Sequence, residues 1–301
     1  MINKPYSVAV IGLGAMGMGA AQSCVKAGLI TYGVDLDETV LEKLKKDGAY
    51  AVSQSAVDFA DKLDAVVLLV VNAAQVNVVL FGENGLAEKL NQGTAVMVSS
   101  TISAQDAKEI SQKLTSLGLV MLDAPVSGGA AKAAAGEMTV MASGSKQAFD
   151  KLQPVLDAVA GKLYNFGEEI GLGATVKIIH QLLAGVHIAA GAEAMALAAK
   201  AGIPLDLMYD VVTNAAGNSW MFENRMKHVV EGDYSPLSMV DIFVKDLGLV
   251  NDTAKSLRFP LHLAGTAYSM FTEASNAGYG KEDDSAVIKI FSGIELPKKG
   301  A

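Results

Sequence analysis

Short apolar runs recur along the first half of the chain, and polar stretches separate them. The runs are rich in Val, Ile, Leu and Ala and too short for typical helices, which predicts buried β-strands. The strands are expected at 8–12, 30–35, 65–71, 95–99, 120–124 and 139–142, with a weaker one at 49–52. Helical patterns follow at 16–27 and 36–46. Strands that alternate with helices predict an α/β fold with a doubly wound, mostly parallel sheet of the Rossmann type.

The pattern changes after residues 167–173, where glycines are frequent. No strand is expected beyond this stretch, and an apolar helical run opens at Ala174. We therefore predict two domains. The first, at 1–168, is the Rossmann-type α/β domain, and the second, at 169–301, is all-helical.

The helical run that opens the second domain contains three polar residues in an apolar setting. Lys177, His180 and Gln181 lie at i, i+3 and i+4, so a helix places them on one face. The continuation at 185–202 is almost entirely apolar, and we expect the C-terminal helices to bury it nearly all round. Because a buried ammonium without a partner is costly, Lys177 needs either a partner or a chemical task.

The same helical run raises a membrane-spanning alternative over 178–199. His180, Gln181, His187 and Glu193 interrupt this stretch, which disfavours the alternative. The N-terminal segment shows no signal-peptide cleavage pattern and runs directly into the first expected strand. We therefore expect no membrane partner.

Composition narrows the class of protein and its partners. The 301 residues are 51% hydrophobic and 19% charged, which is typical of a globular protein. A net charge of −8 argues against binding to nucleic acid or to an anionic membrane surface. The single cysteine, Cys24, excludes an internal disulfide and is consistent with a reducing cytoplasm, where we expect the protein to work. A small molecule is the partner that remains.

A G-x-G-x-x-G motif lies between the first expected strand and the first expected helix. It consists of Gly12, Leu13, Gly14, Ala15, Met16 and Gly17. The first glycine permits a tight turn, the second lets the main chain approach a pyrophosphate, and the third lets the helix pack on the strand. Asp35 follows Gly17 by 18 residues, where its carboxylate can bind the ribose hydroxyls of NAD and repel the 2′-phosphate of NADP. We predict NAD, although the glycines alone would also fit FAD.

A second glycine motif follows the expected strand at 120–124. Ser127, Gly128 and Gly129 end the segment DAPVSGG, at the edge where open α/β sheets bind ligands. Their hydroxyl and N–H groups can bind a carboxylate. An ordinary Gly-Gly turn is the alternative. The pair Lys245-Asp246 lies in another apolar helical run, where at least one side chain is expected to face inward and an exposed ion pair is the alternative.

Metal-dependent and acyl-transfer chemistry are not expected. The His, Cys and Asp residues show no spacing typical of a metal site. Ser127 lacks the G-x-S-x-G signature of a nucleophilic serine.

Together, four motifs resemble the β-hydroxyacid dehydrogenase family, which includes 3-hydroxyisobutyrate dehydrogenases and tartronate semialdehyde reductases. They are IGLGAMGMG at 11–19, DAPVSGG at 123–129, GLGATVKIIHQ at 171–181 and KDL at 245–247. They span nearly the whole chain in the family's order and spacing. The resemblance implies a Rossmann domain, a helical domain and an active site between them, with Lys177 as the catalytic acid/base. It also implies that Val71, Thr101 and Lys245 lie near the cofactor.

His180 departs from the family's common pattern, in which an asparagine three positions after the lysine helps to bind substrate. The pair His180-Gln181 resembles the branch of the family that acts on L-threonate, a four-carbon sugar acid. On this resemblance we expect NAD-dependent oxidation of L-threonate to 2-dehydro-L-erythronate, with both residues contacting the extra hydroxyls. A buried structural histidine is the alternative for His180. Tartronate semialdehyde reduction, 3-hydroxyisobutyrate dehydrogenase-like activity and a dinucleotide sensor without turnover are the alternative functions.

This expectation places a chemical requirement on Lys177. It must be neutral to take the substrate's hydroxyl proton, whereas a free lysine titrates at about 10.4. Partial burial would lower its pKa, as would the positive charge of Lys245 if it lies nearby. The helical half of the chain is also expected to form a subunit interface, so we predict a homodimer or homotetramer.

Overall fold

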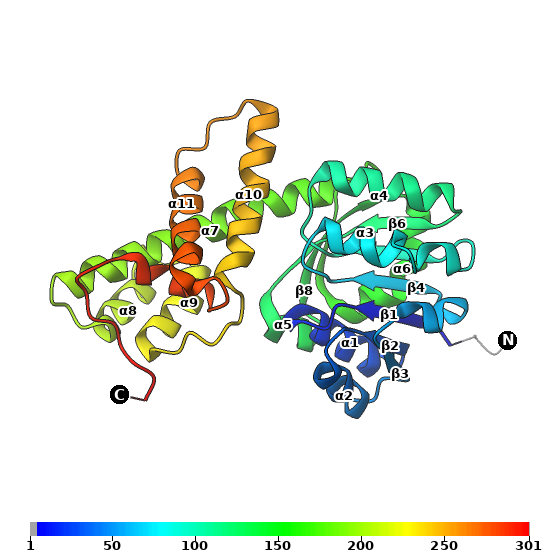
Figure 1. Cartoon of the computed structure of the whole chain (residues 1–301), viewed down its shortest axis with the longest axis horizontal. Coiled ribbons are helices and arrows are strands. Elements are labelled where there is room, and N and C mark those ends of the chain that lie inside the picture. Colours follow the sequence, from blue (N-terminus) through cyan, green and yellow to red (C-terminus); the bar gives the residue numbers. More distant parts are fainter. Residues whose placement is uncertain (1–4, 301) are drawn as a thin grey trace. The chain divides into compact units, whose positions relative to one another are not determined.

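The computed structural model describes residues 5–300. Within this range the chain forms two compact units, which divide between Lys177 and Ile178. The first unit is a sheet with helices on both faces, and the second is built of helices (Figure 1). The predicted fold class is therefore confirmed.

Parallel strands form the part of the sheet that contains the predicted dinucleotide loop. They are β1 (Ser7–Ile11), β2 (Ile30–Val34), β3 (Ala51–Ser53), β4 (Ala65–Leu68), β5 (Ala95–Val98) and β6 (Val120–Asp123), in the spatial order β3-β2-β1-β4-β5-β6. Val10 of β1 pairs with Gly33 on one side and Val67 on the other. The strand order reverses at β1 and β4, and open α/β sheets bind their ligands at such a reversal.

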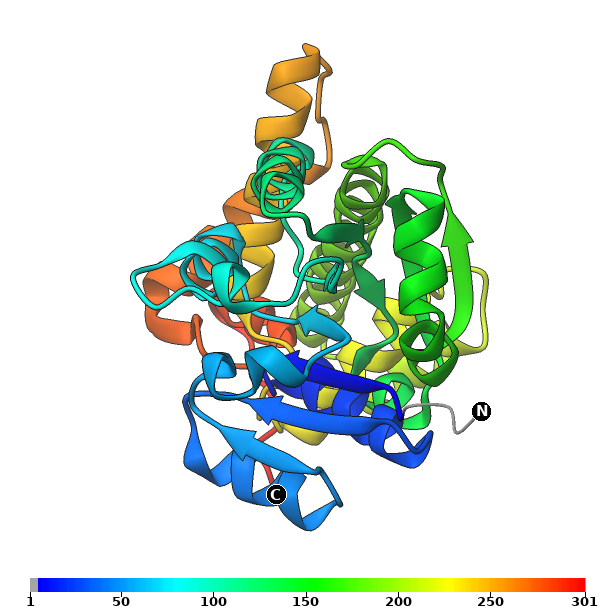
Figure 2. The same ribbon diagram turned by 90° about the vertical axis from the view of Figure 1, so that its right-hand side faces the viewer.

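Alternate residues of each strand enter two separate cores, because successive side chains of a strand point to opposite faces. Val8 and Val10 pack with α1, α2 and α6, whereas Ala9 and Ile11 pack with α3 and α4. Figure 2 shows helices on both sides of the sheet. Burial on both faces explains why the strands are continuous apolar runs. The covering elements are α1 (Ala15–Lys26), α2 (Glu38–Lys46), η1 (Ala56–Lys62), α3 (Ala73–Phe81), η2 (Ala87–Lys89), α4 (Ala104–Ser116), α5 (Gly129–Ala135) and α6 (Lys146–Val159).

Some predicted boundaries are wrong by a few residues. The strand expected at 65–71 ends at Leu68, so Val71 lies in the following loop. The helix expected from Leu36 begins at Glu38, because the Asp37 side chain accepts the main-chain N–H of Thr39 at 2.8 Å and caps the helix. Leu36 is 83% exposed, so its apolar character does not mark a helix face.

The sheet also contains β7 (Val126–Ser127) and β9 (Ala160–Asn165), which the sequence pattern did not predict. The strand expected at 139–142 is β8 (Met138–Gly144), which runs antiparallel to β6 and β7 and parallel to β9. β9 is largely exposed, so it lacks the apolar run that marks a buried strand.

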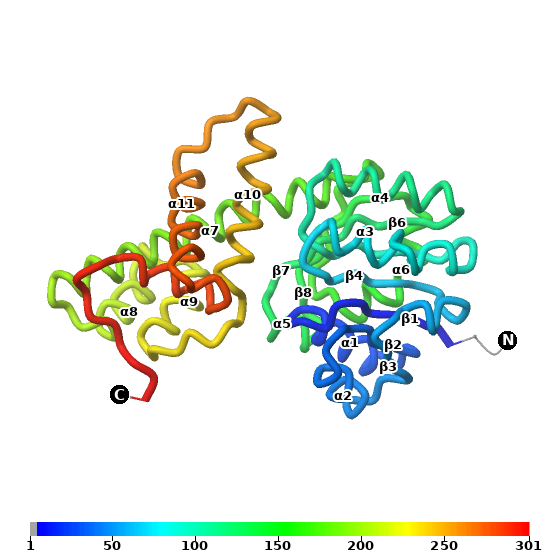
Figure 3. Tube along the Cα trace, in the orientation of Figure 1, coloured from blue at the N-terminus to red at the C-terminus, as the bar shows by residue number. Residues whose placement is uncertain are grey.

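The second unit has a core of its own. Apolar side chains such as Ile188, Met195, Phe222 and Phe271 meet in it. α10 packs along α11 (Figure 3). The helices are the later turns of α7 (Leu172–Lys200), then α8 (Leu205–Thr213), α9 (Trp220–Glu231), α10 (Val240–Leu257), α11 (Ala264–Ala274), the π-helical turn η3 (Ser275–Tyr279) and the 3-10 turn η4 (Asp284–Ile290).

The prediction that the helix is buried nearly all round over 185–202 is wrong, because Ala190, Glu193, Leu197 and Lys200 are exposed there. Ile179, Leu183 and Leu197 are 56%, 52% and 69% exposed, and their spacing places them on one face. Among the described residues, α7 is long and apolar enough to cross a membrane by length and composition. Half of its most apolar window is nevertheless buried in the protein, so packing in a core accounts for much of this composition.

The division between the two units lies inside α7, beyond the glycine-rich segment where the predicted boundary at 168/169 falls. The first turn of α7 belongs with the sheet, because the N–H groups of Gly171, Gly173 and Ala174 bond to side chains of β6 and β8. The side chain of Ala174 also joins the core between the sheet and α4. Glycines mark where the chain can turn, whereas packing decides where one unit ends.

Candidate active site

The cofactor motif forms a tight turn directly after β1. Gly12 has a φ of +88°, and a Cβ there would lie 2.8 Å from the carbonyl oxygen of Leu69. A Cβ on Gly17 would overlap the carbonyl oxygen of Gly12. Glycine is therefore required at both positions for the turn to close against β4 and the first turn of α1.

Gly14 leaves the N-terminus of α1 open. It is the N-cap residue, and a Cβ built on it would have no described heavy atom within 4 Å. Among the described residues, no side chain caps α1 and no acidic residue lies in its first turn. The helix therefore presents main-chain N–H groups and the positive end of its dipole, an arrangement that fits a pyrophosphate. Ala15 and Met16 form the first residues of this helix.

Asp35 lies just after β2 and braces the same turn. Its Oδ2 accepts the N–H of Leu13 at 2.6 Å, and its Oδ1 accepts the N–H of Asp37 at 3.0 Å. Each carboxylate oxygen can accept a further hydrogen bond. The carboxylate can thus hold the loop and also bind a ribose hydroxyl.

Two further predicted cofactor residues follow the strands next to β1. Val71 lies in the loop after β4 and is 43% exposed, and Thr101 lies between β5 and α4. β1, β4 and β5 are parallel neighbours, so the sheet brings the segments after them to one edge. Thr101 does not cap α4, because Ser103 forms a capping box with Asp106.

The substrate motif joins β7 to α5. Ser127 ends β7, where it pairs with Thr139 of β8, and Gly128 and Gly129 have φ values of +131° and +72°. The motif is therefore a turn with backbone angles that favour glycine.

Helix α5 ties the substrate motif to the cofactor helix. α1 approaches α5 at Gly19, where a Cβ would lie 2.6 Å from Ala133. The Ser23 hydroxyl donates to the carbonyl of Ala133, and Lys26 donates to that of Ala134, both at 2.9 Å. The loops that open α1 and α5 are thus held by the same helix pair.

Lys177 lies in the second turn of α7 and is 7% exposed. Its unit also contains the cofactor loop and the substrate motif. Burial of an amine excludes water from it, as expected for a group that exchanges a proton with substrate.

His180 and Gln181 belong to a chain of polar contacts in the second unit. The Nδ1 of His180 lies 3.0 Å from Oε1 of Gln181, and the Gln181 amide donates to Oδ2 of Asp246 at 2.6 Å. The Nζ of Lys245 lies 2.7 Å from Oδ1 of Asp246. Asp246, at 2% exposure, joins the predicted residues Gln181 and Lys245, so an exposed ion pair is excluded.

Asp246 was not among the predicted site residues. The sequence did contain an indication of its role, because Asp246 is the second residue of the KDL motif inside an apolar helical run. The contact also balances the charge of Lys245.

A second buried ion pair lies in the helical unit, and the sequence pattern did not indicate it. The Nε of Arg225 in α9 lies 2.7 Å from Oδ1 of Asp284 in η4. Burial raises the pKa of Asp284 to about 7, although the Arg225 charge acts in the opposite direction. Among residues 5–300, no group of His, Cys, Asp and Glu is arranged to hold a metal ion.

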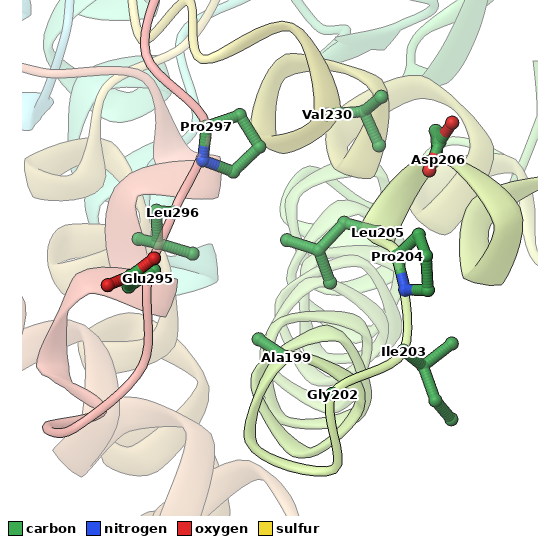
Figure 4. A pocket seen from close by; sticks show the side chains of 10 residues that line it. All are labelled: Ala199, Gly202, Ile203, Pro204, Leu205, Asp206, Val230, Glu295, Leu296 and Pro297. Atoms are coloured by element: carbon green, nitrogen blue, oxygen red, sulfur yellow. The ribbon is translucent and has the colours of Figure 1, made fainter.

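A groove of about 600 Å³ lies elsewhere in the helical unit. Leu205 of α8 and Leu296 of the C-terminal segment lie on opposite sides of it (Figure 4). It is lined by none of the predicted site residues, so it is not the candidate active site.

Known proteins resemble this chain along its whole length. Residues 7–167 match the family model of the NAD binding domain of 6-phosphogluconate dehydrogenase. Residues 171–291 match the model described as NAD-binding of NADP-dependent 3-hydroxyisobutyrate dehydrogenase.

Individual relatives are similar at high identity. A protein named L-threonate dehydrogenase from Haemophilus influenzae is 83% identical over 301 residues, which cover all of both chains. A protein of the same name from Pectobacterium atrosepticum is 77% identical over 294 residues, covering 98% of this chain and 97% of that one. The crystal structure of a 3-hydroxyisobutyrate dehydrogenase from Salmonella typhimurium has a TM-score of 0.93 and 69% identity, covering 95% of this chain and 100% of that one.

Proposed function

Since the chain belongs to the β-hydroxyacid dehydrogenase family of NAD-dependent enzymes, we propose that it oxidises L-threonate to 2-dehydro-L-erythronate in the cytoplasm. The observation that carries the proposal is the full-length, 83% identity to a protein named L-threonate dehydrogenase. The pair His180-Gln181 supports it, because polar groups beside the reacting lysine suit a substrate with several hydroxyls. Membership of an enzyme family leaves no reason to retain the sensor alternative.

The cofactor is NAD, and the first unit fits it. The open N-terminus of α1 at Gly14 and the turn at Gly12 can bind the pyrophosphate, while Asp35 can accept from the ribose hydroxyls and repel a 2′-phosphate. Val71, Thr101 and Lys245 are proposed to contact the remainder of the dinucleotide. Bound NAD supplies the hydride acceptor.

Proton transfer is assigned to Lys177. Ser127, Gly128 and Gly129 bind the substrate carboxylate through hydroxyl and N–H donors. The neutral amine of Lys177 then takes the proton from the substrate hydroxyl. At the same time, the hydrogen on the hydroxyl-bearing carbon leaves with the electron pair of its C–H bond as hydride. The alcohol becomes a carbonyl, because the proton of its oxygen passes to Lys177 and the hydride of its carbon passes to the hydride acceptor, which balances the two-electron oxidation.

Selectivity for the four-carbon acid is assigned to His180. When its Nδ1 donates to Gln181, a neutral imidazole keeps Nε2 as an acceptor that suits a substrate hydroxyl. Gln181 is itself bonded to buried Asp246, which fixes the direction of its amide. We propose that Gln181 contributes through the orientation of His180 rather than by direct contact with substrate.

The decisive experiment is a substrate panel with the purified protein. L-threonate, 3-hydroxyisobutyrate and other short hydroxy acids are mixed with NAD, and NADH absorbance is followed. Tartronate semialdehyde is tested in reverse with NADH. The highest kcat/KM is expected for L-threonate. A higher value for 3-hydroxyisobutyrate, the substrate in the name of the Salmonella relative, would replace the proposal with that activity.

We also propose a homodimer or homotetramer. Ile179, Leu183 and Leu197 form an exposed apolar stripe along one face of α7. A second copy of the chain would cover this stripe. Light scattering at micromolar concentration should give at least twice the 31.2 kDa of one chain. A mass of one chain would contradict the proposal.

A further inference from the structure

The buried carboxylate of Asp123 lies at the start of the helix that carries Lys177. Asp123 ends β6 and is 1% exposed. Its Oδ2 accepts the main-chain N–H groups of Gly171 at 3.0 Å and Ala174 at 2.9 Å. The first turn of a helix has N–H groups without partners inside the helix, and here a side chain from the sheet binds them.

Ser143 of β8 completes this attachment. Its hydroxyl donates to Oδ2 of Asp123 at 3.2 Å and accepts the N–H of Gly173 at 3.1 Å. Asp123 and Ser143 are paired residues of neighbouring antiparallel strands, so the sheet itself sets their separation. Two side chains on a rigid sheet thus bind three N–H groups of the helix start.

Gly173 lets the helix approach the sheet this closely. A Cβ on it would lie 2.6 Å from the carbonyl oxygen of Met141 and 2.7 Å from that of Asp123. The helix start therefore fits against β6 and β8 in one position. A negative group at this end of the helix also interacts favourably with the helix dipole.

We propose that Asp123 is a positioning residue for Lys177, which it places through the hydrogen bonds at the first turn of α7. Lys177 follows Ala174 by three residues, so about one helical turn separates the bound N–H group from the residue that carries the amine. Misplacement of a reacting group by about 1 Å can reduce the rate by about 10²-fold. The inference rests on the proposed role of Lys177.

The surroundings of Asp123 favour this role over that of a proton donor. The groups bonded to its carboxylate are two main-chain N–H groups and a hydroxyl, all of them neutral. Burial raises the pKa of Asp123 to about 6, while these hydrogen bonds act to lower it. At pH 8 the group is therefore a carboxylate, which accepts hydrogen bonds only.

Asp123→Ala, Asp123→Asn and Ser143→Ala test the inference at pH 8. Asp123→Ala should lower kcat by roughly 10- to 100-fold, with less than about a threefold change in KM and in the affinity for NAD. Asn keeps an oxygen acceptor for the same N–H groups, so Asp123→Asn should restore most of the lost kcat. Ser143→Ala should lower kcat by a smaller factor, because it removes the acceptor of a single N–H group.

Amide hydrogen exchange gives a readout that does not depend on turnover. Exchange at residues 171–174 should accelerate in Asp123→Ala and return towards the original rate in Asp123→Asn. Glu169→Gln is the matched control, because this exposed residue pairs with Lys108 beside the same segment. It should change neither kcat nor amide exchange at 171–174.

The outcomes separate this inference from the proposed function. If Lys177→Ala is inactive while Asp123→Ala keeps full kcat, Asp123 does not position the lysine, and the proposed function stands. Equal loss of kcat in the Ala and Asn variants, or a change in KM alone, would also overturn the inference. If Asp123→Ala does not fold, Ser143→Ala and Asp123→Asn still decide it through kcat and amide exchange. An active Lys177→Ala would instead contradict the proposed function.

Discussion

The sheet unit and the helical unit hold their buried and half-buried carboxylates in different ways. In the sheet unit, Asp35 accepts from the N–H groups of Leu13 and Asp37, and Asp123 accepts from those of Gly171 and Ala174. In the helical unit, Asp246 and Asp284 lie against Lys245 and Arg225, and Asp283 is the exception that accepts the N–H groups of Leu237 and Ser285.

The difference follows from the elements that meet in each unit. Strands and helices of an open α/β sheet leave main-chain N–H groups at turns and helix starts, and a carboxylate can bind them without a charged partner. Packed helices bind most of their N–H groups internally, so Asp246 and Asp284 are bound by charged side chains, whereas Asp283 lies at the N-cap of η4 and accepts main-chain N–H groups. Substitution by any residue except proline leaves a main-chain donor in place, whereas substitution readily removes a charged side chain.

The largest effect on activity is expected at Lys177, in the sheet unit, where main-chain N–H groups bind the carboxylates. Lys177→Ala should lower kcat by about 10²–10⁴-fold on every substrate while NAD affinity stays nearly unchanged, because the proton acceptor is lost and the anchored helix start remains. Lys177→Arg should lose almost as much, since a guanidinium stays protonated. Steady-state kinetics and NAD titration measure both quantities. Lys200→Ala, at the exposed end of α7, is the control and should remain active.

Substitution of Arg225 tests how much the buried ion pair with Asp284 stabilises the helical unit. Arg225→Met should lower the free energy of unfolding by about 3–5 kcal/mol at pH 8, because it leaves the Asp284 carboxylate buried without its cation.

The direction of the pH dependence follows from the raised pKa of Asp284. The stability that this group contributes is present below its unfolded value of 3.8 and is lost as pH rises through about 7. The destabilisation by Arg225→Met should therefore be smaller at pH 5 than at pH 8. Denaturant unfolding at both values measures it. Lys227→Met, which removes an exposed pair with Glu231, should change stability by less than about 1 kcal/mol. A pH-independent loss would show that packing of Arg225, rather than its charge, is what matters.

His180→Asn should act on selectivity. It should reduce kcat/KM for L-threonate by an amount worth about 1–3 kcal/mol and leave a shorter hydroxy acid much less affected, because a polar contact to the longer substrate is lost. His187→Asn, further along α7, is the matched control and should change neither value. Equal loss on all substrates would mean that His180 does not select the substrate.

The smallest effect is expected at Asp35. Asp35→Ser should reduce the preference for NAD over NADP by roughly tenfold, because the repulsion of the 2′-phosphate is lost across a half-exposed site. Kinetics with both cofactors gives this ratio. Asp37→Ser keeps a hydroxyl at the cap of α2 and should leave the ratio unchanged. If Asp35→Ser keeps the original preference, another group selects the cofactor.

The sequence predicted the strands that are buried on both faces and missed a strand that is largely exposed. β1 and β4 to β6 are buried on both faces, so their apolar runs could be read from the chain. β9 is largely exposed and has no such run. α7 is apolar on its buried face and on its exposed stripe alike, so composition could not distinguish them.

The Rossmann fold, the glycine turn at Gly12, the glycine required at Gly17, and Asp35 beside them could be predicted from the sequence, because local backbone geometry and strand burial impose these residues. The sequence also indicated Lys177, because an ammonium in an apolar helix requires either a partner or a chemical task. Only the tertiary structure showed that Asp123 and Ser143 bind the start of α7, that Asp246 joins Gln181 to Lys245, and that Arg225 meets Asp284. Apart from the contact between the neighbours Lys245 and Asp246, these contacts join residues 30 to 65 positions apart in the chain. Hydrogen bonds and ion pairs form between groups that folding brings together, and no local pattern encodes such pairs.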